Sequence, residues 1–275
     1  MKYSIIPYEG CNIISQVYEL NLTRIYPAED VIKYVENHPN QRLVIRGYHW
    51  KDFVSSTDYT DHYYPYFKQN PQCSTICFCI PIDVFEEFSS EDKQYWKDNI
   101  PCYMFDYGCK TWDELYEQLF YGAAEVIVYG ELGFSIDKVS EIVHAAGAQL
   151  VVIPDMVQNG ARDVSYNNIR KFFIRPEDTD LYENYVDIFK LTATGNALDI
   201  HYTAYAGTKD WFGPLKEIIY GLKSDIDNRC IIQPFGQARL TCGQKCIKCG
   251  KCDICGRCEE LSETMRDADL IFYKK

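Results

Sequence analysis

CYMFDYGCKTWDELYEQLFYGAAEVIVYGELGFSIDKVSEIVHAAGAQLVVIPD, from Cys102 to Asp155, alternates short apolar runs with longer amphipathic stretches. The runs at 102–106, 125–130 and 149–155 have the length and apolar character of buried strands. Strands that alternate with helices at this spacing form right-handed parallel βαβ units. This stretch therefore predicts part of a parallel α/β fold.

The two amphipathic stretches between these runs carry helix boundaries. Thr111 and Glu114 form a capping box at the start of the first helix, and Ser135 caps the second. Gly122 and Gly147 follow the two helices, as expected for residues that end a helix.

The same rhythm extends in both directions along the chain. Further strands are expected at Arg42–Tyr48, Thr75–Asp83, Lys171–Ile174, Tyr185–Leu191 and Asp199–Tyr205. With the three strands above they make eight, and a helix over Trp211–Leu222 would close the set. We therefore predict a (β/α)8 TIM-type barrel. An open doubly wound sheet is the alternative, but no Gly-rich phosphate loop follows a strand.

This fold divides the chain into two parts. Residues 1–223 are expected to be the barrel domain, with 1–40 as a segment that leads into it, and 224–275 a Cys-rich metal-binding tail. The composition, 47% hydrophobic and 25% charged residues, is that of a globular protein. No apolar run is long enough for a membrane span and no secretory leader is evident, so we expect a cytoplasmic protein without membrane partners.

The tail contains CGQKCIKCGKCDICGRC, from Cys242 to Cys258. In a reducing compartment, such closely spaced thiols favour metal binding over disulfides. No histidine follows His201, so the site would be all sulfur, which suits an iron–sulfur cluster or zinc. Successive C-x2-C steps with one remote cysteine favour a 4Fe-4S cluster, whereas the CIKCG and CDICG knuckles favour structural zinc. The candidate ligands are Cys230, Cys242, Cys246, Cys249, Cys252, Cys255 and Cys258.

Charge is distributed unevenly. The whole chain has a formal net charge of -12, which disfavours indiscriminate binding to nucleic acid. The stretch 229–257, however, contains six basic residues against Asp253 alone. These cations either contact an anion such as RNA or offset thiolate charge around a metal.

A (β/α)8 barrel places its active site where the strands end. Carboxylates there can carry acid–base or nucleophilic chemistry, and cations can hold an anionic substrate. We expect Asp106, Asp155 and Arg175 to be catalytic, and Arg46, His49 and Lys190 to bind substrate. Other residues expected at the mouth are Asp83, Glu131, Gln158, Glu177 and Tyr205.

Two further groups of side chains have alternative readings. The aromatic stretch Tyr59–Gln72 is expected to be a long loop, either a lid over the mouth or a cover for the barrel side. Cys77 and Cys79 alternate along an apolar strand and are expected in the core, whereas Cys109 is either a reactive thiol or a packed or exposed one.

LYEQLFYGAAEVIVYGELGFSIDKVSEIVHAAGAQLVV resembles the barrel segment of the peptidase U32-like family, and FFIRPEDTDLYENYVDIFKL is similar to its later strand–helix–strand. The resemblance covers about residues 100–222. It implies a barrel with an oxygen-sensitive iron–sulfur cluster that supports hydroxylation of RNA bases or quinone precursors; other members are peptidases. The cysteines here crowd into a tail after the last helix, where the family spreads them through the barrel.

Three functions follow from these observations. The first is an iron–sulfur barrel enzyme that modifies RNA or a small aromatic substrate. The second is a barrel transglycosylase or hydrolase with a structural zinc tail. The third is a non-catalytic module whose zinc tail binds nucleic acid or protein. The identity of the metal separates the first from the others.

Overall fold

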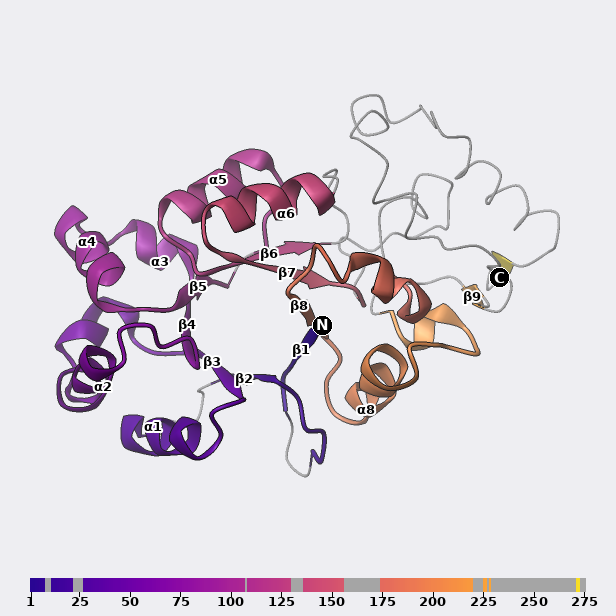
Figure 1. Cartoon of the computed structure of the whole chain (residues 1–275), viewed down its shortest axis with the longest axis horizontal. Helices are drawn as coiled ribbons and strands as arrows, with labels where there is room; N and C mark the ends of the chain where they lie inside the picture. Colours follow the sequence, from indigo (N-terminus) through magenta and orange to yellow (C-terminus); the bar gives the residue numbers. More distant parts are fainter. Residues whose placement is uncertain are drawn as a thin grey trace.

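Eight parallel strands close into a single barrel in the computed structural model, with helices on the outside (Figure 1). Each strand pairs with the next in chain order, and β1 also pairs with β8. The structure describes residues 1–7, 11–21, 27–106, 108–129, 136–155, 174–219, 225–226, 228 and 271–272. The predicted (β/α)8 TIM-type fold is confirmed.

The strands of the barrel are short. Their bounds are β1 Lys2–Ile5, β2 Val17–Asn21, β3 Arg42–Arg46, β4 Ile76–Ile80, β5 Tyr103–Phe105, β6 Glu125–Tyr129, β7 Gln149–Ile153 and β8 Ile188–Lys190. A second, two-stranded sheet pairs β9 (Asp225–Ile226) with β10 (Ile271–Phe272).

Helices and single turns connect the strands. The α-helices are α1 Ala28–Asn37, α2 Tyr64–Gln69, α3 Ile82–Glu86, α4 Ser90–Asn99, α5 Trp112–Phe120, α6 Ile136–Ala145 and α8 Asn196–Tyr202. The 3-10 turns are η1 Trp50–Ser55, η3 Pro176–Tyr182 and η5 Leu215–Glu217, and the π-helical turns are η2 Asp58–Tyr63 and η4 Thr203–Thr208. Within the described part of the chain, no helix is long and apolar enough to span a membrane.

The central βαβ units form as the sequence predicts. The Thr111 hydroxyl accepts a hydrogen bond from the Glu114 N–H, and the Glu114 carboxylate accepts one from the Thr111 N–H. Gly122 and Gly147 adopt positive φ angles of 85° and 77° after their helices. A Cβ on Gly122 would lie 2.8 Å from the Tyr103 hydroxyl, so the close helix–strand contact also requires glycine there.

The count of eight strands is right, but the assignment of two of them is wrong. Residues 1–40 are not a segment that leads into the barrel; they contain β1, β2 and α1. The predicted strand Asp199–Tyr205 is helical instead, and its neighbourhood buries Leu198, His201, Ala204 and Tyr205 at helical spacing. Ile174 belongs to no strand, and 171–173 lie outside the described residues.

Two other predicted elements also differ. The stretch Tyr59–Gln72 is mostly helical, not a loop, and buries Tyr59, Tyr63 and Phe67 at four-residue spacing. These rings therefore pack against the barrel side, in agreement with the second reading of that stretch. Over Trp211–Leu222 the described residues form only the short turn η5, and 220–222 lie outside them.

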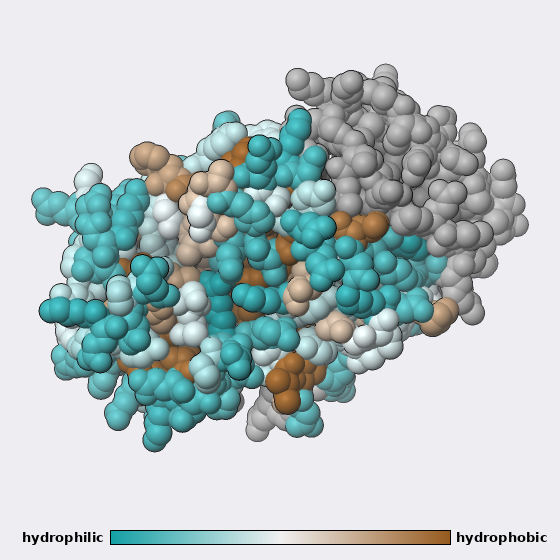
Figure 2. All heavy atoms as spheres, viewed as in Figure 1, coloured by the Kyte–Doolittle hydropathy of each residue, from teal (hydrophilic) through white to brown (hydrophobic). Residues whose placement is uncertain are grey.

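Two apolar clusters stabilise the barrel. The larger lies between the strands and the surrounding helices and includes Leu43, Ile45 and Phe78. The smaller lies inside the barrel and includes Val17, Val44, Cys77, Cys79 and Ile127. Because successive side chains alternate along a strand, Leu43 and Ile45 face outward while Arg42, Val44 and Arg46 face inward. On the surface that Figure 2 shows, hydrophilic side chains cover most of the face, with apolar ones scattered between them.

Candidate functional site

The candidate site lies at the C-terminal end of the barrel, where the strands deliver charged side chains. Arg46 is the last residue of β3, and Lys190 is the last residue of β8. Asp106 directly follows β5, and its N–H donates to the Ile80 carbonyl over 3.0 Å. Glu19 reaches the same region from β2. This is the end at which (β/α)8 barrels place their active sites.

Glu19 is the centre of a buried ion cluster. Its Oε2 accepts hydrogen bonds from Lys190 Nζ at 2.8 Å and from Arg46 Nη2 at 3.1 Å. Its Oε1 accepts one from the Ser4 hydroxyl at 3.1 Å. Burial acts to raise the pKa of Glu19, but the attraction of Lys190 and Arg46 outweighs it and holds that pKa below its ordinary value. Glu19 is therefore an anion between two cations.

A cavity of about 530 Å³ opens beside this cluster, a volume within the range of sites for small ligands. Three residues predicted from the sequence to be functional line it together: Arg46, His49 and Asp106. The other lining residues are Gly47, Tyr48, Trp50, Lys51, Asp52, Cys79, Pro81 and Val84. The lining thus combines a cation, a carboxylate and aromatic rings.

Two of the charged residues that line this cavity, Asp106 and Arg46, differ in their environments. Partial burial raises the pKa of Asp106, and nearby Asp83 raises it further, against the opposing effect of Arg46. Burial acts to lower the pKa of Arg46, but Glu19 more than compensates and the pKa is raised. Arg46 is thus a permanent cation beside a carboxyl group that holds its proton more tightly than usual.

Asp155 occupies a different, closed position after β7. It is fully buried and accepts hydrogen bonds from the Thr192 N–H at 2.9 Å and from the Thr192 hydroxyl at 3.0 Å. Its second oxygen lies 2.9 Å from Nδ1 of His201, whose Nε2 lies 3.2 Å from the Glu217 carbonyl. These contacts connect the end of β7 to the β8–α8 loop and to η5.

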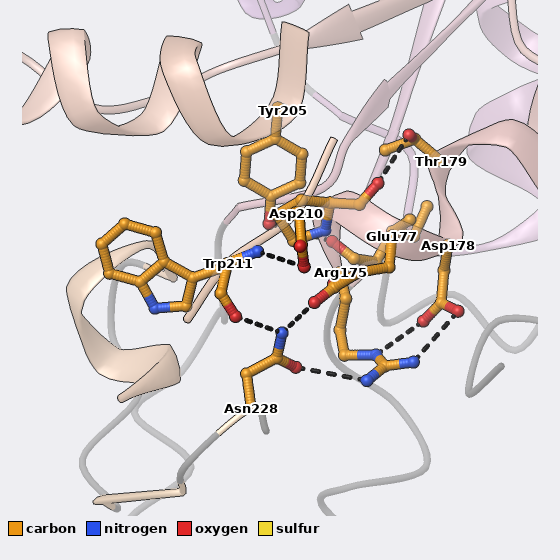
Figure 3. A network of polar contacts seen from close by, with 10 residues as sticks. Arg175, Glu177, Asp178, Thr179, Tyr205, Asp210, Trp211 and Asn228 are labelled. Carbon is orange, nitrogen blue, oxygen red and sulfur yellow. Dashed lines mark hydrogen bonds and ion pairs between the residues drawn. The ribbon is translucent and has the colours of Figure 1, made fainter. Parts of the chain in front are cut away.

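Arg175 belongs to a third network, shown in Figure 3. Its guanidinium donates to both oxygens of Asp178, at 2.8 and 3.2 Å, and to the Asn228 side-chain oxygen at 3.2 Å. The Asn228 amide donates to the Trp211 carbonyl at 2.9 Å and also to Glu177. Burial raises the pKa of Glu177. The network thus connects Asn228 to Arg175, to Glu177 of η3 and to Trp211.

The structure therefore separates the six predicted site residues. Arg46, His49 and Asp106 share the cavity, and Lys190 contacts Arg46's partner Glu19. Asp155 and Arg175 are buried with fixed partners and do not line that cavity. Of the other predicted mouth residues, Asp83 is exposed in the first turn of α3, and Tyr205 is buried with its hydroxyl bonded to the Ile174 carbonyl. Glu131 and Gln158 lie outside the described residues.

The cysteines divide in the same way. Cys77 and Cys79 are buried inside the barrel, as predicted, and Cys109 is buried where it bridges to Val128. The seven candidate metal ligands, Cys230, Cys242, Cys246, Cys249, Cys252, Cys255 and Cys258, lie outside the described residues. Among the residues that the structure describes, no three His, Cys, Asp or Glu side chains are arranged to hold a metal ion.

Sequence reasoning missed Glu19 and Ser4, the two other members of the ion cluster. Both lie within residues 1–40, which were expected to be a segment leading into the barrel. The alternation in VYELN, with Val17 and Glu19 on one face, could have identified a strand with an inward-facing carboxylate. The chain matches no protein-family model, and a search of curated proteins found no match.

Proposed function

We propose that the protein is a (β/α)8-barrel enzyme that binds a small anionic substrate with a flat ring at the cavity beside Arg46. We further propose that the tail holds an iron–sulfur cluster, as the U32-like resemblance implies. One observation supports the substrate proposal most strongly. The Arg46 guanidinium lines an open cavity, and it makes only one hydrogen bond to Glu19.

Charge favours an anionic ligand. Glu19 is one buried carboxylate with two cationic partners, so the cluster of Glu19, Arg46 and Lys190 carries one net positive charge. Among the described residues, the Arg46 guanidinium makes one hydrogen bond, from Nη2 to Glu19. A guanidinium with unused donors suits a carboxylate or phosphate, which it can bind through two parallel hydrogen bonds.

The lining favours a ring. Tyr48 and Trp50 border the cavity and contact each other at 5.3 Å between ring centroids. Their partners Phe53 and Phe78 hold them from the core side, so the aromatic wall is preorganised. A flat substrate can pack against this wall while its anionic group contacts Arg46.

Asp106 is the group that moves a proton in this proposal. Its pKa is raised by burial, so it retains a proton at higher pH than an ordinary aspartate and can give it up within the cavity. A carboxyl group of this kind suits general acid–base catalysis. Asp155 and Arg175 position the segments at the barrel mouth in this proposal, because their buried hydrogen bonds connect these segments.

The cluster proposal rests on the chemistry of the donor set. Six thiols between Cys242 and Cys258, with no histidine after His201, suit a cluster or zinc and no nitrogen-ligated metal. A bound cluster would supply one-electron redox chemistry, consistent with modification of an RNA base or a small aromatic compound. Zinc would instead support the hydrolase or transglycosylase alternative, with Asp106 as its carboxylate.

The metal is tested first. Protein purified without air is analysed for iron, labile sulfide and zinc, and its visible absorption is recorded. We expect iron and sulfide with a broad visible band that air bleaches. Zinc without visible absorption would overturn the cluster, and protein without either metal would overturn metal binding by the tail.

The cavity is tested separately by calorimetric titration with benzoate, benzyl alcohol and cyclohexanecarboxylate. We expect benzoate to bind best, because it alone of the three has both a flat aromatic ring and a negative charge. A parallel pair, cytidine 5′-monophosphate and cytidine, tests an RNA-like ligand. Arg46→Met should weaken benzoate or nucleotide binding at least about tenfold, whereas Lys51→Met at the rim should not. Equal binding by wild type and Arg46→Met would overturn the assignment of the cavity.

A further inference from the structure

A second pair of reactive groups lies at the opposite, N-terminal end of the barrel. Phe78 of β4 is in register with Tyr103 of β5, so the preceding residues, Cys77 and Cys102, stand side by side. The Phe78 N–H donates to the Cys102 carbonyl over 3.1 Å, which fixes this register. Both side chains belong to the apolar cluster inside the barrel, and neither cysteine is in a disulfide.

The spacing of these two residues suits a disulfide. Neighbouring strands lie about 4.7–4.9 Å apart. This falls within the separations of about 4.4–6.8 Å between the Cα atoms of bonded cysteines. Both thiols belong to the same apolar cluster inside the barrel. Little backbone movement would be needed for an S–S bond.

The two thiols differ in pKa, and one cause is Arg42. Its Nη2 lies 2.8 Å from Cys102 Sγ, and its Nη1 donates to the Gln149 side chain over 2.8 Å. The hydrogen bond from Cys77, together with the attraction of Arg42, lowers the pKa of Cys102 against the effect of burial. Burial raises the pKa of Cys77 well above its ordinary value. Cys102 is thus the nucleophile of the pair, and Cys77 is the thiol that stays protonated.

Other buried cysteines do not share these features. Burial raises the pKa of Cys79 to about 12, and it also raises the pKa of Cys109. Thiolate character, and with it reactivity toward oxidants, is therefore concentrated at Cys102 among these buried thiols. Cys79 and Cys109 are matched controls, because each lies in the same polypeptide stretch as one member of the pair.

We propose that Cys77 and Cys102 form a two-electron redox pair that hydrogen peroxide oxidises to a disulfide. Cys102 Sγ attacks one peroxide oxygen, the O–O bond breaks, and the leaving oxygen departs as water, which leaves a sulfenic acid. Cys77 then loses its proton and attacks that sulfur; the S–O bond breaks, the S–S bond forms, and a second water leaves. The two thiols lose two electrons, and one peroxide is reduced to two waters.

Burial limits this site to small oxidants. Cys102 is 3% exposed, and the Arg42 side chain at this end of the barrel is 11% exposed. Peroxide can approach such a position, whereas a bulky disulfide such as oxidised glutathione cannot. The site is independent of the proposed substrate cavity, which lies at the other end of the barrel, and of the tail cysteines.

Peptide mapping of the full-length protein tests this proposal without any variant. Anaerobic protein is treated with equimolar hydrogen peroxide, blocked with N-ethylmaleimide in denaturant and digested with trypsin. We expect peptides 69–93 and 98–110 to be joined, with the loss of two hydrogens. Digests that show no such link, or that join either peptide mainly to peptides of the tail, would overturn the proposal.

Serine variants locate the bond. Cys79→Ser and Cys109→Ser should keep the link, whereas Cys77→Ser and Cys102→Ser should lose it. In Cys77→Ser the sulfenic acid has no neighbouring thiol, so dimedone should label peptide 98–110. A link that persists in Cys77→Ser, or dimedone labelling that persists in Cys102→Ser, would show that other thiols react. Circular dichroism confirms that each variant used is folded.

Discussion

Each end of the barrel has an arginine from the same strand, β3. The two arginines have different partners and therefore different roles. Arg42 begins β3 and Arg46 ends it, and both face inward. Arg42 is enclosed by its partners Glu125, Gln149 and Cys102, although its Nε, like that of Arg46, has no hydrogen-bond partner among the described residues. Arg46 bonds Glu19 and then borders a cavity of about 530 Å³. The cavity therefore separates the two roles: an arginine that borders an open cavity suits a ligand site, and one enclosed by its partners forms a structural ion pair.

An apolar layer separates the two ends. Val44 lies between the two arginines on β3, and Val17, Ile127 and Val151 belong to the same interior cluster. This layer keeps the two charged groups out of direct contact, but it does not screen their charges, because it excludes water. Glu19 and Lys190 act on the pKa of Glu125 in opposite directions, so their effects across the layer oppose each other.

The largest effect is expected at the N-terminal end. Arg42→Met removes the counter-charge of Glu125, which is buried and whose pKa is already raised by burial. Leaving one buried charge without its partner costs about 3–5 kcal/mol of unfolding free energy. Urea denaturation at neutral pH measures this loss. A loss below about 1 kcal/mol would contradict the structural role of Arg42.

A smaller effect is expected from Glu19→Gln at the C-terminal end. The variant leaves Arg46 and Lys190 as neighbouring cations, and the loss of charged hydrogen bonds should cost about 1.5–3 kcal/mol. Because the folded state lowers the pKa of Glu19, the stability it contributes is present above the ordinary value of 4.5 and is lost as pH falls through the folded-state pKa. The difference between wild type and Glu19→Gln should therefore shrink in acid. A difference that stays constant through denaturation curves at falling pH would contradict the anionic state of Glu19.

Asp106→Asn should change the pH dependence of ligand binding and leave stability nearly unchanged. In the wild type the carboxyl group loses its proton as pH rises through its raised pKa, and the new negative charge lies close to Arg46, Lys190 and Asp83. Affinity for benzoate should then fall about tenfold with rising pH, since the cavity loses one unit of positive charge. Asp106→Asn should keep the low-pH affinity throughout. Identical pH profiles would exclude Asp106 as the titrating group.

The smallest effect is expected for Lys51→Met. Lys51 lines the cavity, but it is exposed, as is its ion-pair partner Glu87. Exposed ion pairs contribute little because solvent screens them. Neither stability nor benzoate affinity should change measurably. A clear loss of affinity would move the anion site from the inner wall of the cavity to its rim.

The sequence predicted the fold best where strands are wholly apolar and helices carry caps. The units from Cys102 to Asp155 match the structure, because the capping box at Thr111 and the glycine stops act locally. β1 and β2 escaped prediction because Ser4 and Glu19 place polar atoms inside the barrel, where the apolar pattern that identifies a strand is interrupted. The helix α8 was mistaken for a strand since its apolar residues are β-branched or aromatic in part.

The residues of the candidate site could be predicted only where the end of a strand could be predicted. Arg46, His49 and Asp106 follow correctly assigned strands, and the structure places them around one cavity. Asp155 and Arg175 also follow apolar runs, but their contacts with Thr192, Asp178 and Asn228 depend on segments far away in the chain. No local pattern distinguishes a carboxylate that faces a cavity from one that is buried among loop donors.

The comparison of the two arginines gives the most direct test. Thermal unfolding of wild type, Arg42→Met and Arg46→Met is measured with and without saturating benzoate. We expect Arg42→Met to lower Tm strongly while benzoate still raises it as in the wild type. We expect Arg46→Met to lower Tm less and to lose the rise with benzoate. The opposite pattern, with ligand stabilisation lost in Arg42→Met and kept in Arg46→Met, would contradict the account.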